Sequence, residues 1–92
     1  MEVRFFAIYD EKGLVYKNPF TFPHRGQAVR VFAELANDPR TEIGRHPEDF
    51  VLYEIGTFDD VSGELGNVTN VVLHRALELV DLDGPIPDGS SN

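Results

Sequence analysis

The clearest alternation of apolar and polar side chains lies in residues 50–58, Phe-Val-Leu-Tyr-Glu-Ile-Gly-Thr-Phe. Side chains two positions apart share one face of a strand. One face of this predicted strand therefore carries Val51, Tyr53 and Ile55, and the other carries Phe50, Leu52, Glu54 and Gly56. A proline-centred turn at residues 46–49 precedes the strand, and an acidic turn at residues 59–63 follows it.

The N-terminal segment predicts a β-hairpin. Residues 3–9 are rich in β-branched and aromatic types, and the odd positions from Val3 to Tyr9 make one apolar face. Residues 10–13, Asp-Glu-Lys-Gly, are typical of a tight turn in which Gly13 takes a positive φ. Residues 14–17 then return as a second strand. Residues 18–23 contain two prolines, which remove ladder donors, so we expect an extended loop there.

One segment has the period of an amphipathic helix. Between residues 26 and 37, Ala28, Val31, Phe32 and Leu35 fall at i, i+3, i+4 and i+7. Arg30 and Glu34 form an i, i+4 pair of opposite charge. Asp38 and Pro39 predict the cap of a short second helical turn, which we expect to run through Ile43 and to stop at Gly44.

The C-terminal third is less regular. The turn at residues 59–63 predicts a second hairpin that returns at residues 64–65 or later. Residues 68–80 mix strand and helix periods, and we predict a short strand followed by one or two turns of helix. Residues 81–92 have no periodicity and no basic residue, which predicts a disordered acidic tail. Residues 1–80 are thus expected to form a single α+β domain, with a small antiparallel sheet in β-β-α-β-β order covered by one main helix.

Composition and charge narrow the function classes. The chain has 92 residues, is 41% hydrophobic and has no cysteine, so disulfides and thiol chemistry are excluded. It shows no signal peptide and no apolar run long enough to span a membrane, which predicts a soluble cytosolic protein. The net charge is −8, but the segment from Lys12 to Arg45 holds six basic residues against three acids. Residues 46–92 hold ten acids and only Arg75 as a strong base.

The mildly basic segment contains the candidate binding surface. Cations and aromatic rings alternate there, at Tyr16, Lys17, Phe20, Phe22, Arg25 and Arg30. Single-stranded nucleic acid is bound by such a mixture, because cations pair with phosphates and bases stack on rings. The alternative is that Phe20 and Phe22 anchor the loop to the core while the cations only solubilise it.

Catalytic and metal sites are not predicted. The three histidines, His24, His46 and His74, lie too far apart for a local ligand motif, and we predict no metal and no cofactor. His46 is expected to be a turn residue, and Glu48 and Asp49 to cap a helical turn or to be solvated. Residues 59–64 lack the ligand spacing of a calcium loop. The sequence therefore favours a protein without enzymatic activity.

Six segments in register resemble the small non-structural protein of gokushoviruses, the tailless single-stranded-DNA phages of the Microviridae. They span roughly residues 5–80. The most specific is the turn His46, Pro47, Glu48 and Asp49 together with the Phe-Asp-Asp turn after the strand. The others are residues 6–10, 18–20, 26–32, 37–39 and 52–63. The valine-rich run at residues 68–73 departs from the pattern.

The resemblance implies a phage accessory protein that is made during infection and acts in the switch from single-stranded-DNA replication to packaging. It implies binding to ssDNA or to the phage replication protein, in the host cell cytoplasm, and supplies no catalytic residues. The alternative is a protein-interaction factor directed at a host protein, with no DNA binding. An exposed sheet edge also favours a homodimer that pairs edge to edge.

Overall fold

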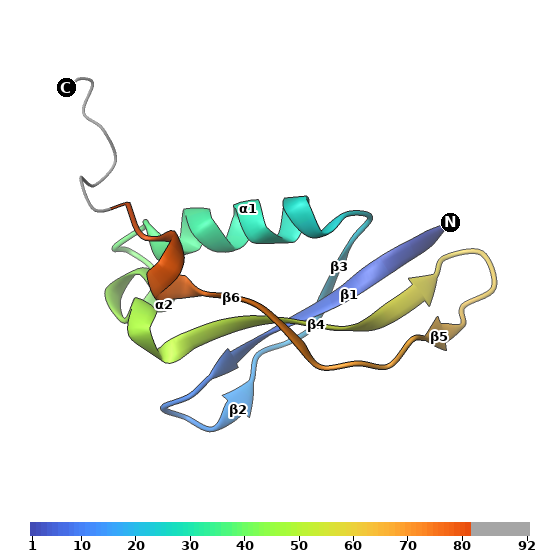
Figure 1. Cartoon of the computed structure of the whole chain (residues 1–92), viewed down its shortest axis with the longest axis horizontal. Helices are drawn as coiled ribbons and strands as arrows, with labels where there is room; N and C mark the ends of the chain where they lie inside the picture. The colour runs from blue at the N-terminus through green and yellow to red at the C-terminus, as the bar shows by residue number, and fades with distance from the viewer. Residues whose placement is uncertain (82–92) are drawn as a thin grey trace, which may run out of the picture.

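Two long strands form the centre of the structure, a computed structural model that describes residues 1–81 (Figure 1). Strand β1, Glu2–Asp10, and strand β4, Phe50–Asp59, pair antiparallel along their whole length. The register runs from Glu2 opposite Asp59 to Asp10 opposite Phe50, with a bulge at Ile55. The N-terminal strand is therefore paired with residues that lie 40 positions (Asp10 with Phe50) to 57 positions (Glu2 with Asp59) away in the chain.

Short strands complete the sheet on both sides of this pair. Strands β2, Val15–Tyr16, and β3, Phe20–Phe22, both pair with β1. Strands β5, Leu65–Gly66, and β6, Val71–Arg75, both pair with β4. All pairings are antiparallel. The predicted α+β class is confirmed, although the sheet of the described residues has six strands rather than four.

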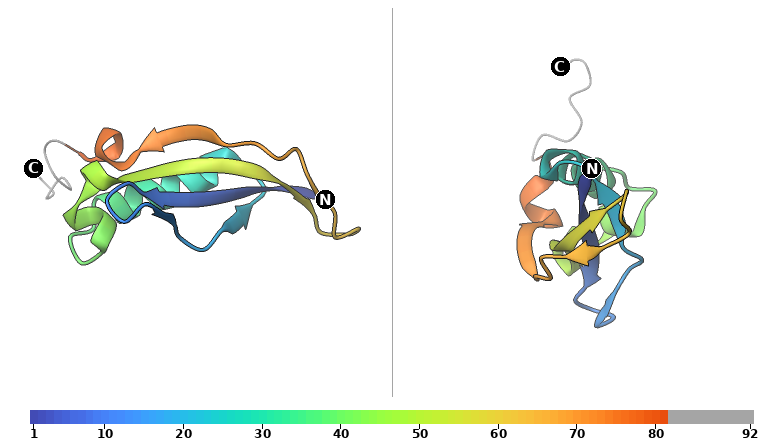
Figure 2. Two further views of the ribbon diagram at one scale, coloured as in Figure 1. Left: turned by 90° about the horizontal axis from the view of Figure 1, so that it is seen from below. Right: turned by 90° about the vertical axis from the view of Figure 1, so that its right-hand side faces the viewer.

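Helix α1, Arg25–Ala36, covers one face of the sheet (Figure 2). Phe32 and Ala28 of the helix are fully buried and belong to one core cluster with Phe6, Ile8 and Leu52 of the central strands. The helix therefore packs on the even-numbered positions of β1, and the odd-numbered positions face away from it. In the left view of Figure 2, α1 lies behind the strands and no helix crosses the middle of the opposite face.

The segment after α1 differs from the prediction. Helix α2, Glu42–Arg45, is capped by Thr41, whose Oγ1 accepts from the Gly44 N–H at 2.9 Å. The Asp38 carboxylate instead accepts hydrogen bonds from Arg40. Gly44 does not stop the helix but lies inside it. Glycine is needed there because a Cβ would be 1.9 Å from the carbonyl oxygen of Asp38. A 3₁₀ turn, η1, Pro47–Asp49, then leads into β4.

Two further predictions need correction in the N-terminal hairpin. Residues 20–22 form β3 rather than a loop, because both prolines flank the three residues that pair with β1. In the turn, Leu14 has the positive φ, 58°, that Gly13 was expected to take. Gly13 instead packs closely on Asp10, whose carboxylate accepts its N–H.

The predicted second hairpin and the predicted short strand with a helical turn are both present. The acidic turn contains Gly63 at a φ of 77° and leads to β5 at the predicted position. Strand β6 is followed by the 3₁₀ helix η2, Ala76–Leu79, which matches the predicted short strand and helical turn. The backbone N–H of Asp81 donates to Asn37 Oδ1 at 2.9 Å. The rest of the predicted disordered tail, residues 82–92, lies outside the described residues. Within residues 1–81, none of the helices has the length and apolar character needed to cross a membrane.

Candidate binding surfaces

The six residues of the predicted nucleic-acid surface do not form one surface. Tyr16 pairs with Tyr9 across β2 and β1 and lies on the face of the sheet away from α1. Phe20 and Phe22 of β3 are half-buried against the core, with the Phe20 ring stacked 5.8 Å from that of Phe6. The anchoring role considered for these two phenylalanines is therefore present in the structure, and the prediction that they bind nucleic acid stays a prediction.

Arg25 belongs to a charge cluster around a buried carboxylate. The Glu54 side chain is only 7% exposed and lies on the core face of β4. It accepts hydrogen bonds from Arg25 Nε at 2.5 Å and from Arg4 Nη1 at 3.0 Å. Burial on its own raises the pKa of Glu54, but the hydrogen bonds from Arg25 and Arg4 outweigh it, and the pKa lies below its ordinary value. Arg25 is therefore paired with Glu54 inside the protein rather than presented as an unpaired cation.

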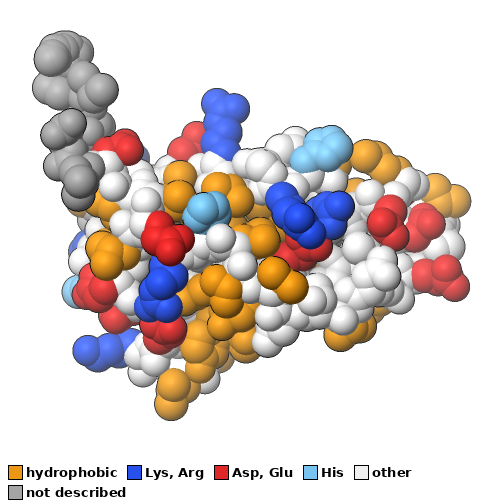
Figure 3. All heavy atoms as spheres, viewed as in Figure 1, with side chains coloured by type: hydrophobic (Ala, Val, Ile, Leu, Met, Phe, Trp, Pro, Cys, Tyr) orange, Lys and Arg blue, Asp and Glu red, His pale blue; other side chains and the backbone are white. Residues whose placement is uncertain are grey.

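Most other cations are also matched by acids. Lys17 Nζ lies 3.1 Å from Glu42 and 5.4 Å from the centre of the Phe50 ring. Arg30 and Glu34 form the predicted helical pair at 3.8 Å, and both are highly exposed. Among residues 1–81, six of the eight basic side chains have a carboxylate within 4.0 Å. Figure 3 shows acidic and basic side chains interspersed over the face that it draws, rather than one basic field.

An open apolar groove of about 750 Å³ separates α1 from β3. Val31 and Leu35 of α1 form one wall, Phe20 and Phe22 of β3 form the other, and Lys17 lies at its border. In the right view of Figure 2, β2 and β3 lie on one side of the sheet and β6 on the other, with α1 above. Because β3 pairs only with β1 among the described strands, its outer edge has unpaired backbone groups beside the groove.

The opposite face of the sheet carries a second apolar surface, which we call the open face. It comprises Phe5, Ala7 and Tyr9 of β1, Tyr53 and Ile55 of β4, and Tyr16 of β2. The three tyrosine rings are mutually packed, with centroids 4.5 to 6.3 Å apart. Sequence alternation predicted an apolar face for β1 and another for β4. Only the register between the two strands shows that these apolar faces lie side by side on the same side of the sheet.

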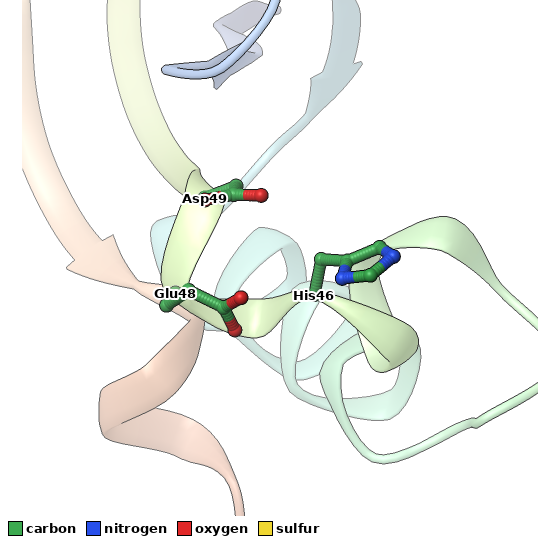
Figure 4. Close-up of side chains that lie close together, drawn as sticks. All are labelled: His46, Glu48 and Asp49. Atoms are coloured by element: carbon green, nitrogen blue, oxygen red, sulfur yellow. The ribbon is translucent and has the colours of Figure 1, made fainter.

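The turn that carries the family resemblance brings three possible ligands together. His46, Glu48 and Asp49 each offer a ligand atom, and these atoms lie within 4.8 Å of one another (Figure 4). The predicted turn is present, since the Asp49 N–H donates to the His46 carbonyl at 3.0 Å. The Glu48 and Asp49 side chains lie in the first turn of η1. The prediction that no metal is bound here stays a prediction.

These features define the class of protein: a small two-layer α+β fold that presents apolar surface on both sides of one sheet. A comparison with protein families matches residues 3–79 to the family described as Phage ORF5 protein. The chain therefore belongs to the Phage ORF5 protein family and is a bacteriophage protein. Searches of curated proteins and of solved structures found no match.

Proposed function

We propose that this phage protein is a non-enzymatic accessory factor of ssDNA replication and packaging, in the manner of the gokushovirus proteins that it resembles. It acts in the host cell cytoplasm by binding a protein of the phage replication machinery. The observation that supports this mode of action is the apolar groove between α1 and β3. Family membership supports the phage context.

The groove has the chemistry of a peptide site. Its volume is within the range of about 300–1,000 Å³ that is usual for ligand sites. An extended partner segment can pair with the free edge of β3 while its side chains enter the groove beside Phe20 and Phe22. Main-chain pairing of this kind supplies affinity, and the side-chain sites supply specificity.

Charge favours a protein partner over broad contact with DNA. Arg25 is committed to Glu54, and Lys17 is committed to Glu42. Phosphate binding requires cations that can pair with the backbone, and these two would first have to leave a carboxylate. A groove with apolar walls and one cation at its border instead matches a largely apolar segment that carries an acid at one end.

A variant of Val31 tests the groove. Val31 is 36% exposed on its α1 wall, so a lysine there keeps its ammonium in water while its stem occupies the groove. We expect Val31→Lys to weaken binding to the phage's purified replication initiation protein at least about tenfold, which corresponds to about 1.4 kcal/mol. Titration calorimetry measures the affinity.

Val61→Lys is the matched control, because Val61 is 86% exposed in the turn between β4 and β5. It adds the same charge far from the groove and should bind like the parent protein. Equal affinities for all three proteins would contradict the groove as the binding site. Absence of binding by the parent protein would redirect the search to a host protein.

Direct binding of ssDNA is the second candidate, because the Arg30–Glu34 pair is exposed and long at 3.8 Å, and such pairs are weak. We expect Arg30→Glu to weaken binding of a labelled oligonucleotide of about 30 nucleotides at low salt if DNA is bound there. Fluorescence anisotropy at two salt concentrations measures this. Arg25→Glu is a poor probe, because it would place a second carboxylate beside Glu54. No saturable binding at low salt would exclude this candidate.

A further inference from the structure

The open face has a composition that exposure to water does not explain. An antiparallel sheet with one face on a core and one in solvent normally alternates apolar with polar residues. Here the positions that face away from α1 carry no charge: they are Val3, Phe5, Ala7 and Tyr9 on β1 and Val51, Tyr53, Ile55 and Phe58 on β4. Ala7 and Val51 are buried, and the others are half-buried. Both faces of the central strands are therefore apolar, although the described helix α1 covers only one of them.

The apolar surface continues to the edge of the sheet. Val72 of β6 lies opposite Tyr53 on the same face and is 52% exposed. Figure 3 shows hydrophobic side chains gathered over β6 and the hairpin that contains β2. Two hollows lie beside Ile55, one of about 210 Å³ and one of about 380 Å³. Side chains of a partner can pack into these hollows. Extended apolar patches of this kind mark interaction sites.

We propose that the open face is covered by a second copy of this chain, in a two-fold dimer that packs sheet against sheet. The interface lies on the opposite side of the sheet from the groove, so the dimer leaves both grooves free. It is also distinct from edge-to-edge pairing, since the strand edges take no part.

Charge supports a second copy over nucleic acid. Two cations lie beside the tyrosines: Arg75 binds Glu11 through two hydrogen bonds of 2.6 and 3.1 Å, and Lys17, which lines the hollow with Tyr16, lies 3.1 Å from Glu42. Within residues 1–81, neither of these two cations is free to bind a phosphate. Glu11 and Arg75 put one acid and one base at the rim of the open face. In a two-fold dimer each Glu11 can lie near the other copy's Arg75, so the two rims have complementary charges. The apolar centre has no charge that would repel its own image.

The area of the open face suits a weak dimer. Strand β1 has nine residues, so at about 3.4 Å per residue the face is roughly 30 Å long. The four strands β2, β1, β4 and β6 have two, nine, ten and five residues, and neighbouring strands lie about 4.8 Å apart. The footprint is then roughly 420 Å² per copy, or about 850 Å² in total, which is in the range of weak or transient interfaces. We therefore expect a dimer with a micromolar dissociation constant.

Sedimentation velocity between about 1 and about 500 µM tests the dimer, since this range brackets a micromolar equilibrium. The weight-average mass should rise from one chain toward two. Val72→Lys should raise the dimer dissociation constant at least about tenfold, whereas Val61→Lys and Val31→Lys should leave it unchanged. Because Val72 is half-exposed, its lysine variant should fold, and circular dichroism checks this.

A measurement on the unmodified protein locates the interface. In a mixture of isotope-labelled and unlabelled chains, isotope-filtered NOEs between copies should connect Tyr9, Tyr53 and Ile55. A monomer over the whole concentration range would overturn the proposal. A dimer that Val72→Lys does not weaken would also overturn the proposal. So would intermolecular NOEs from the outer edge of β3, the outer edge of β6 or the groove instead of from the open face.

Discussion

The double variant Arg4→Ala/Arg25→Ala is expected to lose more stability than the two single variants combined. Each single variant leaves Glu54 with one guanidinium, because the carboxylate binds both arginines. The double variant leaves a buried carboxylate without a charged partner. Breaking a fully buried pair costs about 3–5 kcal/mol, and we expect less here because both guanidinium groups are partly exposed to water. We expect a coupling free energy of about 1–3 kcal/mol from urea unfolding of the four proteins.

Two controls separate this effect from loss of surface charge. Removing the exposed pair Arg30 and Glu34 should change the free energy of unfolding by less than about 0.5 kcal/mol. Adding Glu54→Gln to the double variant should recover stability, since a neutral amide is cheaper to bury than a carboxylate. Additive single and double effects would contradict a shared dependence of Glu54 on both arginines.

The pH dependence of the same variants has a definite sign. In the parent protein the pKa of Glu54 is lowered in the folded state, so its contribution to stability is present above the unfolded pKa and is lost as pH falls through the folded pKa. Without the arginines only burial acts, which raises the folded pKa, so the penalty at neutral pH disappears on acidification. The stability difference between the parent and the double variant should therefore narrow between about pH 7 and about pH 4.

Alanine at Gly44 is expected to be strongly destabilising, by about 3 kcal/mol or more. Its Cβ would lie 1.9 Å from the carbonyl oxygen of Asp38 and 2.9 Å from that of Leu35, and both are backbone atoms that cannot rotate away. Thr41 fixes this connection, because its hydroxyl lies 2.8 Å from both carbonyl oxygens and accepts the Gly44 N–H. Thermal and urea unfolding measure the loss.

Gly26→Ala is the matched control, since it makes the same chemical change inside α1 with nothing within 4 Å of the new methyl group. It should stabilise the protein by roughly 0.5–1 kcal/mol, because alanine loses less backbone entropy in a helix. If Gly44→Ala and Gly26→Ala shifted stability in the same direction, α2 would not be held against residues 35–38 as tightly as the structure shows.

The parts of the fold that local patterns determine were predictable from the sequence. The period of α1, the alternation in β1 and β4 and the turn at residues 59–63 all depend on near neighbours in the chain. Strand β3 was missed because its flanking prolines indicated a loop, while the residues between them kept their backbone donors. The turn of the first hairpin was predicted, but the positive φ of Leu14 was missed because glycine is the usual residue with positive φ.

The candidate surfaces depend on long-range pairing and were only partly predictable. Glu54 offered a signal, because alternation placed a carboxylate on the same face as Phe50 and Leu52 and a buried charge needs a partner. Its partners Arg4 and Arg25 lie 50 and 29 residues away, and no local rule connects them. Tyr16 was predicted as part of a nucleic-acid surface, but its neighbours Tyr9 and Tyr53 follow only from the strand register.

The pairing of β1 with β4 also determines when the chain can fold during its synthesis. The first strand emerges from the ribosome long before its partner, since the pairs run from Glu2 with Asp59 to Asp10 with Phe50. Contacts between such distant segments form slowly, because the loop between them must close first. Strands β2 and β3 can pair with one edge of β1 as soon as they emerge, but the edge that β4 occupies stays free until the second long strand has emerged. Newly made chains in an infected cell are then most open to proteases and chaperones.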